Sequence, residues 1–255
     1  MSVFLVVSAA HSPGVTSLCV ALAVTAGQPA LVVDANREPD QSVLAGYLQG
    51  VDPGGRGLGG LLQAHREHRP LEGALASMVL PLGAGAEFLP GFGHPGMVGL
   101  FAPAWADLAA ALEAEERMVL VDAGRIGAAG LPQPLISASS GVLVVTRSDL
   151  PSLAALRLYL PQLVEAAGED RVGLVVVGPG RPYTGTEIRR RFGVPIWGHL
   201  AWQPEAAAVY ASGAAPGRRH SASAYLDDVR RLAVALAVAL AERDGSRRLL
   251  LGDRP

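Results

Sequence analysis

The stretch of sequence that decides the fold is VFLVVSAAHSPGVTSLCVALAVTA, residues 3–26. Residues 3–7 are all apolar, which is typical of a buried β-strand. Residues 15–26 carry apolar side chains at helical spacing. Between them lies a short turn with Pro13 and Gly14, residue types that are common where a chain changes direction. The sequence therefore predicts a strand that turns directly into a helix.

This order of strand, turn and helix is also that of a phosphate-binding P-loop. A P-loop carries the pattern G-x-x-x-x-G-K-[ST], in which backbone N–H groups at the helix start cradle phosphate and the lysine reaches the outer phosphates. Here Ala9 stands at the first glycine and Val15 at the lysine. The chain contains no lysine, and its 21 Lys-plus-Arg residues are all arginine. We therefore expect the shape of a nucleotide site without its main positive charge.

Composition favours one soluble domain. The chain has 255 residues, half of them hydrophobic, and a net charge of −2, which gives no overall attraction to DNA or to an anionic membrane. Its only cysteine, Cys19, falls on the apolar face of the first helix, so no disulfide forms within the chain. The longest apolar stretch, 232–241, is about half the roughly 20 residues that span a bilayer. We expect a cytoplasmic domain at 1–243 followed by a tail at 244–255.

The expected strands are short apolar runs that alternate with helical patterns. They lie at 3–7, 30–33, 88–89, 118–121, 142–145, 172–177 and 196–200. Strands without polar alternation, separated by helices, are typical of a parallel sheet covered on both faces. We therefore predict a doubly wound α/β fold with a mostly parallel sheet of seven to eight strands. Asp149 marks one helix start, Thr184 with Glu187 forms a capping box, Gly193 ends that helix, and the last helix is expected at 225–243.

Five stretches in this order resemble the ParA/MinD family of deviant P-loop ATPases, and they cover nearly the whole chain. They are SAAHSPGVTSLCVALA (8–23), ALVVDAN (30–36), GLGGLL with EFLPGFG (57–62 and 87–93), MVLVDAG (118–124), and GVLVVTRSDLPSLAALR with GTEIRRRFGVPIWGHLAWQPEAAAVYASGAAP (141–157 and 185–216). Within the family, the chain is most similar to the atypical TadZ/CpaE group, which serves Tad-type pilus assembly. The resemblance implies the P-loop NTPase fold of the ParA/MinD type.

The resemblance also implies a set of nucleotide-site residues. These are His11, Ser12, Pro13, Gly14, Val15, Thr16, Ser17, Asp34, Asp122, Gly124 and Arg181. Thr16, Asp34 and Asp122 match the family's magnesium-side residues and are expected to hold the metal only if MgATP binds. Arg181 stands at a strand end, where it either supplies the missing charge or lies in solvent. His11 either donates to phosphate or is a surface loop residue.

The family's lysines have no counterpart here. Its two lysines at the turn match Ala10 and Val15, and its adenine-reading Asn is replaced within 177–180. Phosphoryl transfer depends on neutralising charge in the transition state, so the loss of both cations predicts little or no ATP hydrolysis. No catalytic residue is assigned and no cofactor is certain. Binding of ATP or ADP with magnesium through backbone N–H groups stays open.

Two functions follow from this resemblance. The first is a bacterial pseudo-ATPase that acts as a localisation or assembly scaffold, as a homodimer, for a protein partner such as a Tad-like pilus or secretion apparatus. The second is a dimerising switch that still binds MgATP through the loop backbone, Thr16 and Asp34. DNA is a less favoured partner because acidic residues dilute the arginine pairs. A membrane surface is less favoured because the three leucines at 249–251 bury too little area for stable anchoring. We expect a cytoplasmic protein, held at the membrane or cell pole only through a partner.

Overall fold

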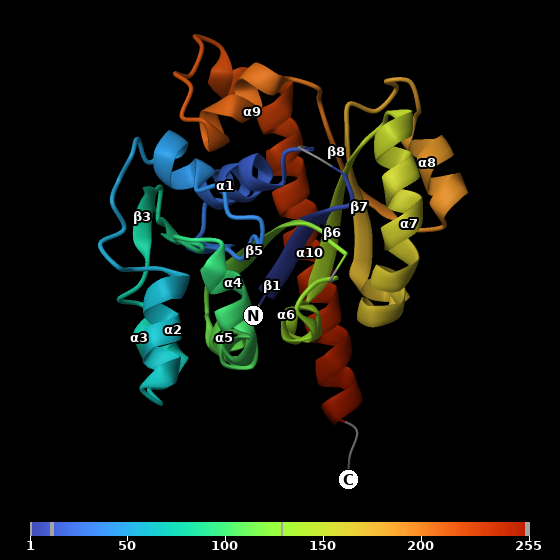
Figure 1. Cartoon of the computed structure of the whole chain (residues 1–255). Helices are drawn as coiled ribbons and strands as arrows, with labels where there is room; N and C mark the ends of the chain where they lie inside the picture. Colours follow the sequence, from blue (N-terminus) through green and yellow to red (C-terminus); the bar gives the residue numbers. More distant parts are fainter. Residues whose placement is uncertain (1, 11–12, 129, 253–255) are drawn as a thin grey trace.

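The computed structural model describes residues 2–10, 13–128 and 130–252, with side chains described as far as residue 238. The strands are β1 (Ser2–Ser8), β2 (Ala30–Asp34), β3 (Leu80–Gly83), β4 (Ala86–Leu89), β5 (Met118–Arg125), β6 (Gly141–Arg147), β7 (Val172–Val177) and β8 (Ile196–Leu200). The α-helices are α1 (Val15–Thr25), α2 (Leu58–Arg66), α3 (Leu71–Leu75), α4 (Gly96–Leu100), α5 (Trp105–Ala114), α6 (Gln133–Ala138), α7 (Leu150–Ala167), α8 (Gly185–Phe192), α9 (Pro204–Ala211) and α10 (Ala224–Gly252). The π-helix η1 (Val43–Tyr47) and the 3-10 helices η2 (Ala102–Ala104), η3 (Glu169–Arg171) and η4 (His220–Ala222) complete the described elements (Figure 1).

The strands form one sheet in the order β3-β4-β2-β5-β1-β6-β7-β8. All neighbouring pairs run parallel except β3 and β4, which are antiparallel. The carboxyl ends of β2, β5, β1, β6, β7 and β8 therefore meet along one edge of the sheet. A ligand site in an open α/β sheet lies at this edge, where the strand order reverses. Here the reversal is at β1, between β5 and β6.

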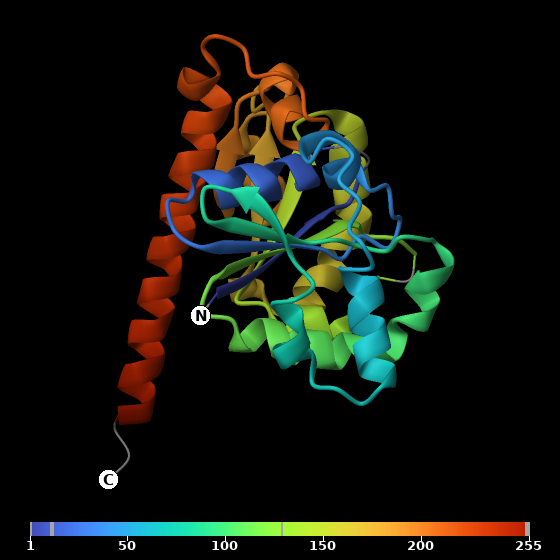
Figure 2. The ribbon, with the colours of Figure 1, turned by 90° about the vertical axis from the view of Figure 1, so that its left-hand side faces the viewer.

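Helices cover both faces of the sheet, because side chains along each strand alternate in direction. Val3, Leu5 and Val7 of β1 belong to one core with residues of α2, α3, α5, α6 and α7. Phe4 and Val6 belong to the other core, with residues of α1 and α10. Figure 2 shows the red α10 along one face and the cyan and green helices on the opposite face. The predicted doubly wound α/β fold is confirmed.

Local sequence signals place the helix ends as expected. The Asp149 side chain caps α7 by accepting a hydrogen bond from the Ser152 backbone N–H at 3.0 Å. Thr184 and Glu187 form a reciprocal capping box at the start of α8. Gly193 ends α8 in the left-handed region at φ 70°. These three assignments needed only the local pattern.

Two features differ from the sequence-based expectation. β3 is an additional edge strand beyond the seven runs that the sequence marks, and its burial alternates over four residues that include Pro81 and Gly83. Such a short one-sided strand lacks a continuous apolar run. The last helix is the other difference, because α10 continues without a break past residue 243 to Gly252. Among the described residues, no helix is long and apolar enough to cross a membrane.

Candidate functional site

The turn between β1 and α1 lies at the centre of the sheet's carboxyl edge. Gly14 adopts φ 96° just before α1, a left-handed conformation that disfavours side chains with a Cβ. Pro13 beside it is buried and offers no N–H donor. The first backbone N–H groups of α1 have no partner within the helix, so they form the phosphate-facing element of such a turn. Of the predicted turn residues, His11 and Ser12 lie outside the described residues.

The two positions that resemblance assigns to lysine carry apolar side chains. Val15 is only 6% exposed and packs with the core between the sheet and α1. Ala10 is partly buried and offers no charge. Ser17 is also buried, one residue beyond Thr16. The turn therefore presents backbone groups and the Thr16 hydroxyl rather than a flexible cation.

Thr16, Asp34 and Asp122 converge at this edge from three elements. The Thr16 hydroxyl donates to Asp122 Oδ2 at 2.5 Å, which joins α1 to β5. Asp34 and Asp122 are direct partners in the register of β2 and β5. The Ala35 backbone N–H also donates to the Asp122 carbonyl at 2.8 Å. The structure thus brings together the three residues that the sequence proposed as a group.

The proximity of the two carboxyl groups changes their acidity. Burial, followed by the nearby charge of Asp122, raises the pKa of Asp34 to about 8. Burial also raises the pKa of Asp122, while hydrogen bonds from Thr16 and the Gly124 N–H act against this rise. Two carboxylates this close in a buried setting without a cation are costly, so the Asp34 carboxyl is mostly protonated at neutral pH.

Small residues and one amide pack closely around this pair. A Cβ added at Gly91 would lie 2.5 Å from Asp34 Oδ2, so only glycine fits there. Gly124 has φ 62°, and a Cβ on it would lie 2.3 Å from Asn36 Oδ1. The sequence reasoning included Gly124 but missed Asn36. The sequence could have pointed to Asn36, because it lies two positions after Asp34 at the end of the same strand.

Arg181, predicted as a site residue, lies against an aromatic ring. Its guanidinium carbon is 5.3 Å from the ring centroid of Trp202, and that of Arg147 is 5.0 Å from the same ring. Both are within the range of cation–π attraction. Arg147 also forms a 2.7 Å ion pair with Asp149. The sequence did not reveal Trp202 and Arg147, because their contact joins the last residue of β6 to the loop after β8.

A hollow of about 210 Å³ lies beside the turn. Pro13, Gly14 and Ser17 line one side, and Val177, Leu200 and Trp202 belong to the opposite strand ends. Ligand pockets typically measure roughly 300–1,000 Å³, so this hollow is small for a whole nucleotide. Tyr225 of α10 also lines it, and its hydroxyl is buried and makes no hydrogen bond with any residue that the structure describes.

The oxygen set of this site fits magnesium in its chemistry. Mg²⁺ prefers carboxylate and hydroxyl oxygens and commonly uses one or two carboxylates with phosphate oxygens. Asp122 and Thr16 supply such oxygens within 2.5 Å of one another, and Asp34 is the strand partner of Asp122. No group of three or more His, Cys, Asp or Glu side chains suited to a metal occurs in residues 2–10, 13–128 or 130–252. A metal here would therefore need ligands from a bound phosphate or water.

Comparison with known proteins identifies the fold. The chain superposes on a ParA family ATPase from Chlorobium tepidum with a TM-score of 0.74 at 18% identity, over 91% of this chain and 98% of that one. It is similar to MinD from Pyrococcus horikoshii complexed with Mg-ADP (TM-score 0.70, 16% identity, 91% and 95% covered). It is also similar to the MinC:MinD complex of Aquifex aeolicus (TM-score 0.69, 16% identity, 93% and 96% covered). No protein-family model and no curated protein matches the chain.

These likenesses establish that the chain has the fold of ParA/MinD ATPases, as the sequence motifs indicated. The altered turn lies inside this shared fold. Because one fold supports many functions, the residues of the site itself decide whether it binds or hydrolyses a nucleotide.

Proposed function

We propose that this chain is a pseudo-ATPase of ParA/MinD fold that acts as a localisation or assembly scaffold with little or no ATP hydrolysis. The observation that carries the proposal is the burial of Val15 in the core, at the position where the P-loop pattern places lysine. Valine carries no charge, so no movement of its side chain can bring a positive group to a phosphate as lysine does.

Charge is the central requirement of phosphoryl transfer. Catalysis depends on positioning the nucleotide and on cations that neutralise the transferring phosphoryl group. The whole chain lacks lysine, and Ala10 leaves the second lysine position uncharged. Arg181, for which supply of the missing charge was one of two alternatives, lies within cation–π range of Trp202. These features together support a site that does not turn over ATP.

A scaffold works through its surfaces, so the proposal includes protein partners. A homodimer in the cytoplasm, bound to a Tad-like pilus or secretion apparatus at the membrane or cell pole, is the proposed setting. Support comes from the fold, since a MinD of this fold is found in complex with the protein MinC. The proposed functional unit is the domain 1–243, with 244–255 as its C-terminal extension.

A nucleotide-dependent dimerising switch is the second candidate, and the Thr16–Asp122–Asp34 cluster favours it. In this case Thr16, Asp34 and Asp122 would hold Mg²⁺, and the backbone N–H groups of the turn would hold phosphate. The metal would neutralise phosphate oxygens when bound. A cation there would also offset the repulsion between the two carboxylates, which after burial is the second cause of the raised pKa of Asp34.

Isothermal titration with MgATP and MgADP tests the first proposal against the second. The pseudo-ATPase proposal predicts no saturable heat at micromolar nucleotide, and phosphate release equal to that of buffer. Micromolar binding of MgATP that is lost in Asp34→Asn and Thr16→Val would establish the switch instead. The variant Val234→Thr, at an exposed site on α10, serves as the matched control.

A further inference from the structure

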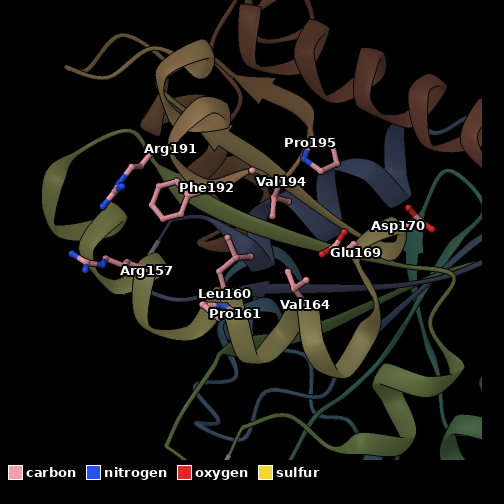
Figure 3. A pocket seen from close by; sticks show the side chains of 11 residues that line it. Arg157, Leu160, Pro161, Val164, Glu169, Asp170, Arg191, Phe192, Val194 and Pro195 are labelled. Atoms are coloured by element: carbon pink, nitrogen blue, oxygen red, sulfur yellow. The ribbon is translucent and has the colours of Figure 1, made fainter.

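Two adjoining hollows lie along α7 and α8, on elements separate from the β1–α1 turn. One measures about 780 Å³ and the other about 770 Å³. Both are lined by Arg157, Arg191 and Phe192, so they form one continuous depression. We refer to it as the α7–α8 groove. Figure 3 shows its second half, between α7 and the end of α8.

The groove is long and follows one stripe of α7. Leu150, Leu153, Arg157, Leu160 and Val164 line it at spacings of three and four residues. Fourteen residues of helix rise by about 21 Å at 1.5 Å per residue. Leu153, Leu160 and Val164 also pack against the chain's own core, so a partner helix would meet only their outer edges together with the exposed Leu150 and Leu158. The shape therefore favours an elongated helical occupant over a small molecule.

Exposed leucines border the groove where a partner would cover them. Leu150 is 64% exposed and Leu158 is 71% exposed, and both line the first hollow. Large aliphatic side chains this exposed on a regular helix are candidates for an interface when they cluster beside a depression. Ile188 and Phe192 of α8 form the apolar wall opposite them.

Charge defines the chemistry of the occupant. Figure 3 shows Arg157 and Arg191 together at one end of the second hollow, and Glu169 and Asp170 at the other end. Within the part of the chain that the structure describes, Arg157 and Arg191 make no hydrogen bond or ion pair with another residue. Arginine pairs most strongly with carboxylates, which accept two parallel hydrogen bonds. The place where the two hollows meet is therefore suited to an acidic side chain.

We propose that the α7–α8 groove binds an amphipathic α-helix of a partner protein, whose apolar stripe covers Leu150 and Leu158 and whose acidic residue pairs with Arg157 and Arg191. The inference rests on the proposed scaffold role, to which it assigns a docking surface. A helix is favoured over a lipid surface because the apolar residues line a depression, whereas a membrane requires side chains that protrude.

The test uses two fluorescein-labelled helical peptides of about 18 residues, long enough to cover the stripe. Both carry the same leucine stripe, one flanked by Glu and the other by Lys. Fluorescence anisotropy with the full chain should show saturable binding of the Glu peptide and binding of the Lys peptide weaker by about tenfold or more. Leu158→Glu should weaken binding of the Glu peptide by about tenfold or more.

Val234→Glu is the matched control, because Val234 is 65% exposed on α10, outside the groove. It should leave peptide affinity unchanged. The double variant Arg157→Glu/Arg191→Glu should reverse the preference, so that the Lys peptide binds more tightly than the Glu peptide. Far-UV circular dichroism identifies any variant that fails to fold.

Three results would overturn the inference. They are absence of saturable Glu-peptide binding, equal binding of the two peptides, and an equal loss of affinity in Val234→Glu. A fourth such result would come from sedimentation with vesicles of phosphatidylcholine and phosphatidylglycerol. It is that the chain binds the vesicles through Leu158 and does not bind the Glu peptide. None of these assays contains nucleotide, so they test the groove independently of nucleotide binding. Binding of MgATP in a separate titration would refute the pseudo-ATPase proposal without changing the peptide result.

Discussion

The hydroxyl of Thr16 donates a hydrogen bond of 2.5 Å to Oδ2 of Asp122, and this bond ties the first turn of α1 to the end of β5. Thr16→Val removes the donor and leaves a buried carboxyl group without this partner. We expect the free energy of unfolding to fall by about 1.5–3 kcal/mol, measured by urea denaturation. Thr16→Ser keeps the hydroxyl and should lose less than about 1 kcal/mol. Equal losses in the two variants would contradict the importance of this bond.

Asp34 makes stability depend on pH in a defined direction. Its pKa is raised to about 8 in the folded chain, mainly by burial, whereas an unfolded aspartate titrates near pH 4. The folded state therefore binds more protons than the unfolded state between these values, and stability contributed by this group falls as pH rises from about 4 to 8. Asp34→Asn removes this dependence, since an amide does not ionise.

Thermal unfolding at pH 5 and pH 8 measures the effect. The gain in melting temperature of Asp34→Asn over the unaltered chain should be larger at pH 8 than at pH 5. Glu38→Gln, at an exposed residue nearby, serves as the control and should show no such difference. A gain in melting temperature for Asp34→Asn that is larger at pH 5 than at pH 8 would show that Asp34 affects stability in the opposite direction.

Tyr225 carries a buried hydroxyl that finds no hydrogen-bond partner among the described residues. Burying such a group costs free energy that its removal recovers. Tyr225→Phe should therefore leave the free energy of unfolding unchanged or raise it by about 1 kcal/mol. Tyr210→Phe offers the contrast, because the Tyr210 hydroxyl lies 3.0 Å from His220 Nε2. Tyr210→Phe should lower the free energy of unfolding by about 0.5–1.5 kcal/mol, measured by urea denaturation. A greater loss of stability in Tyr225→Phe than in Tyr210→Phe would contradict the structure.

Val15→Lys restores the lysine of the P-loop pattern at one position only. We expect phosphate release to remain at the level of buffer, because Ala10 still leaves the second lysine position uncharged. A coupled phosphate assay with MgATP measures this directly. Turnover above buffer in Val15→Lys, abolished by adding Thr16→Ala, would show that the remaining site is competent.

Local sequence patterns were sufficient for most of the fold. The apolar run at β1, the capping box at Thr184 and the aspartates at two strand ends each depend on neighbours in sequence, so the α/β architecture and the meeting of Asp34 with Asp122 were predictable. β3 was missed because one-sided burial over four residues leaves no continuous apolar run.

Long-range contacts set the limit of prediction at the site. Trp202 meets Arg147 and Arg181 only because the end of β6 and the loops after β7 and β8 converge at the sheet edge. The buried hydroxyl of Tyr225 likewise depends on how α10 packs against the turn. No spacing in the sequence marks these contacts, since the residues that form them come from separate elements.

The proposed loss of nucleotide control is measured by sedimentation velocity of the full chain with and without MgATP. We expect one sedimentation coefficient at each protein concentration, and we expect MgATP to leave it unchanged. A species of twice the mass that appears only with MgATP, and disappears in Thr16→Val, would contradict it.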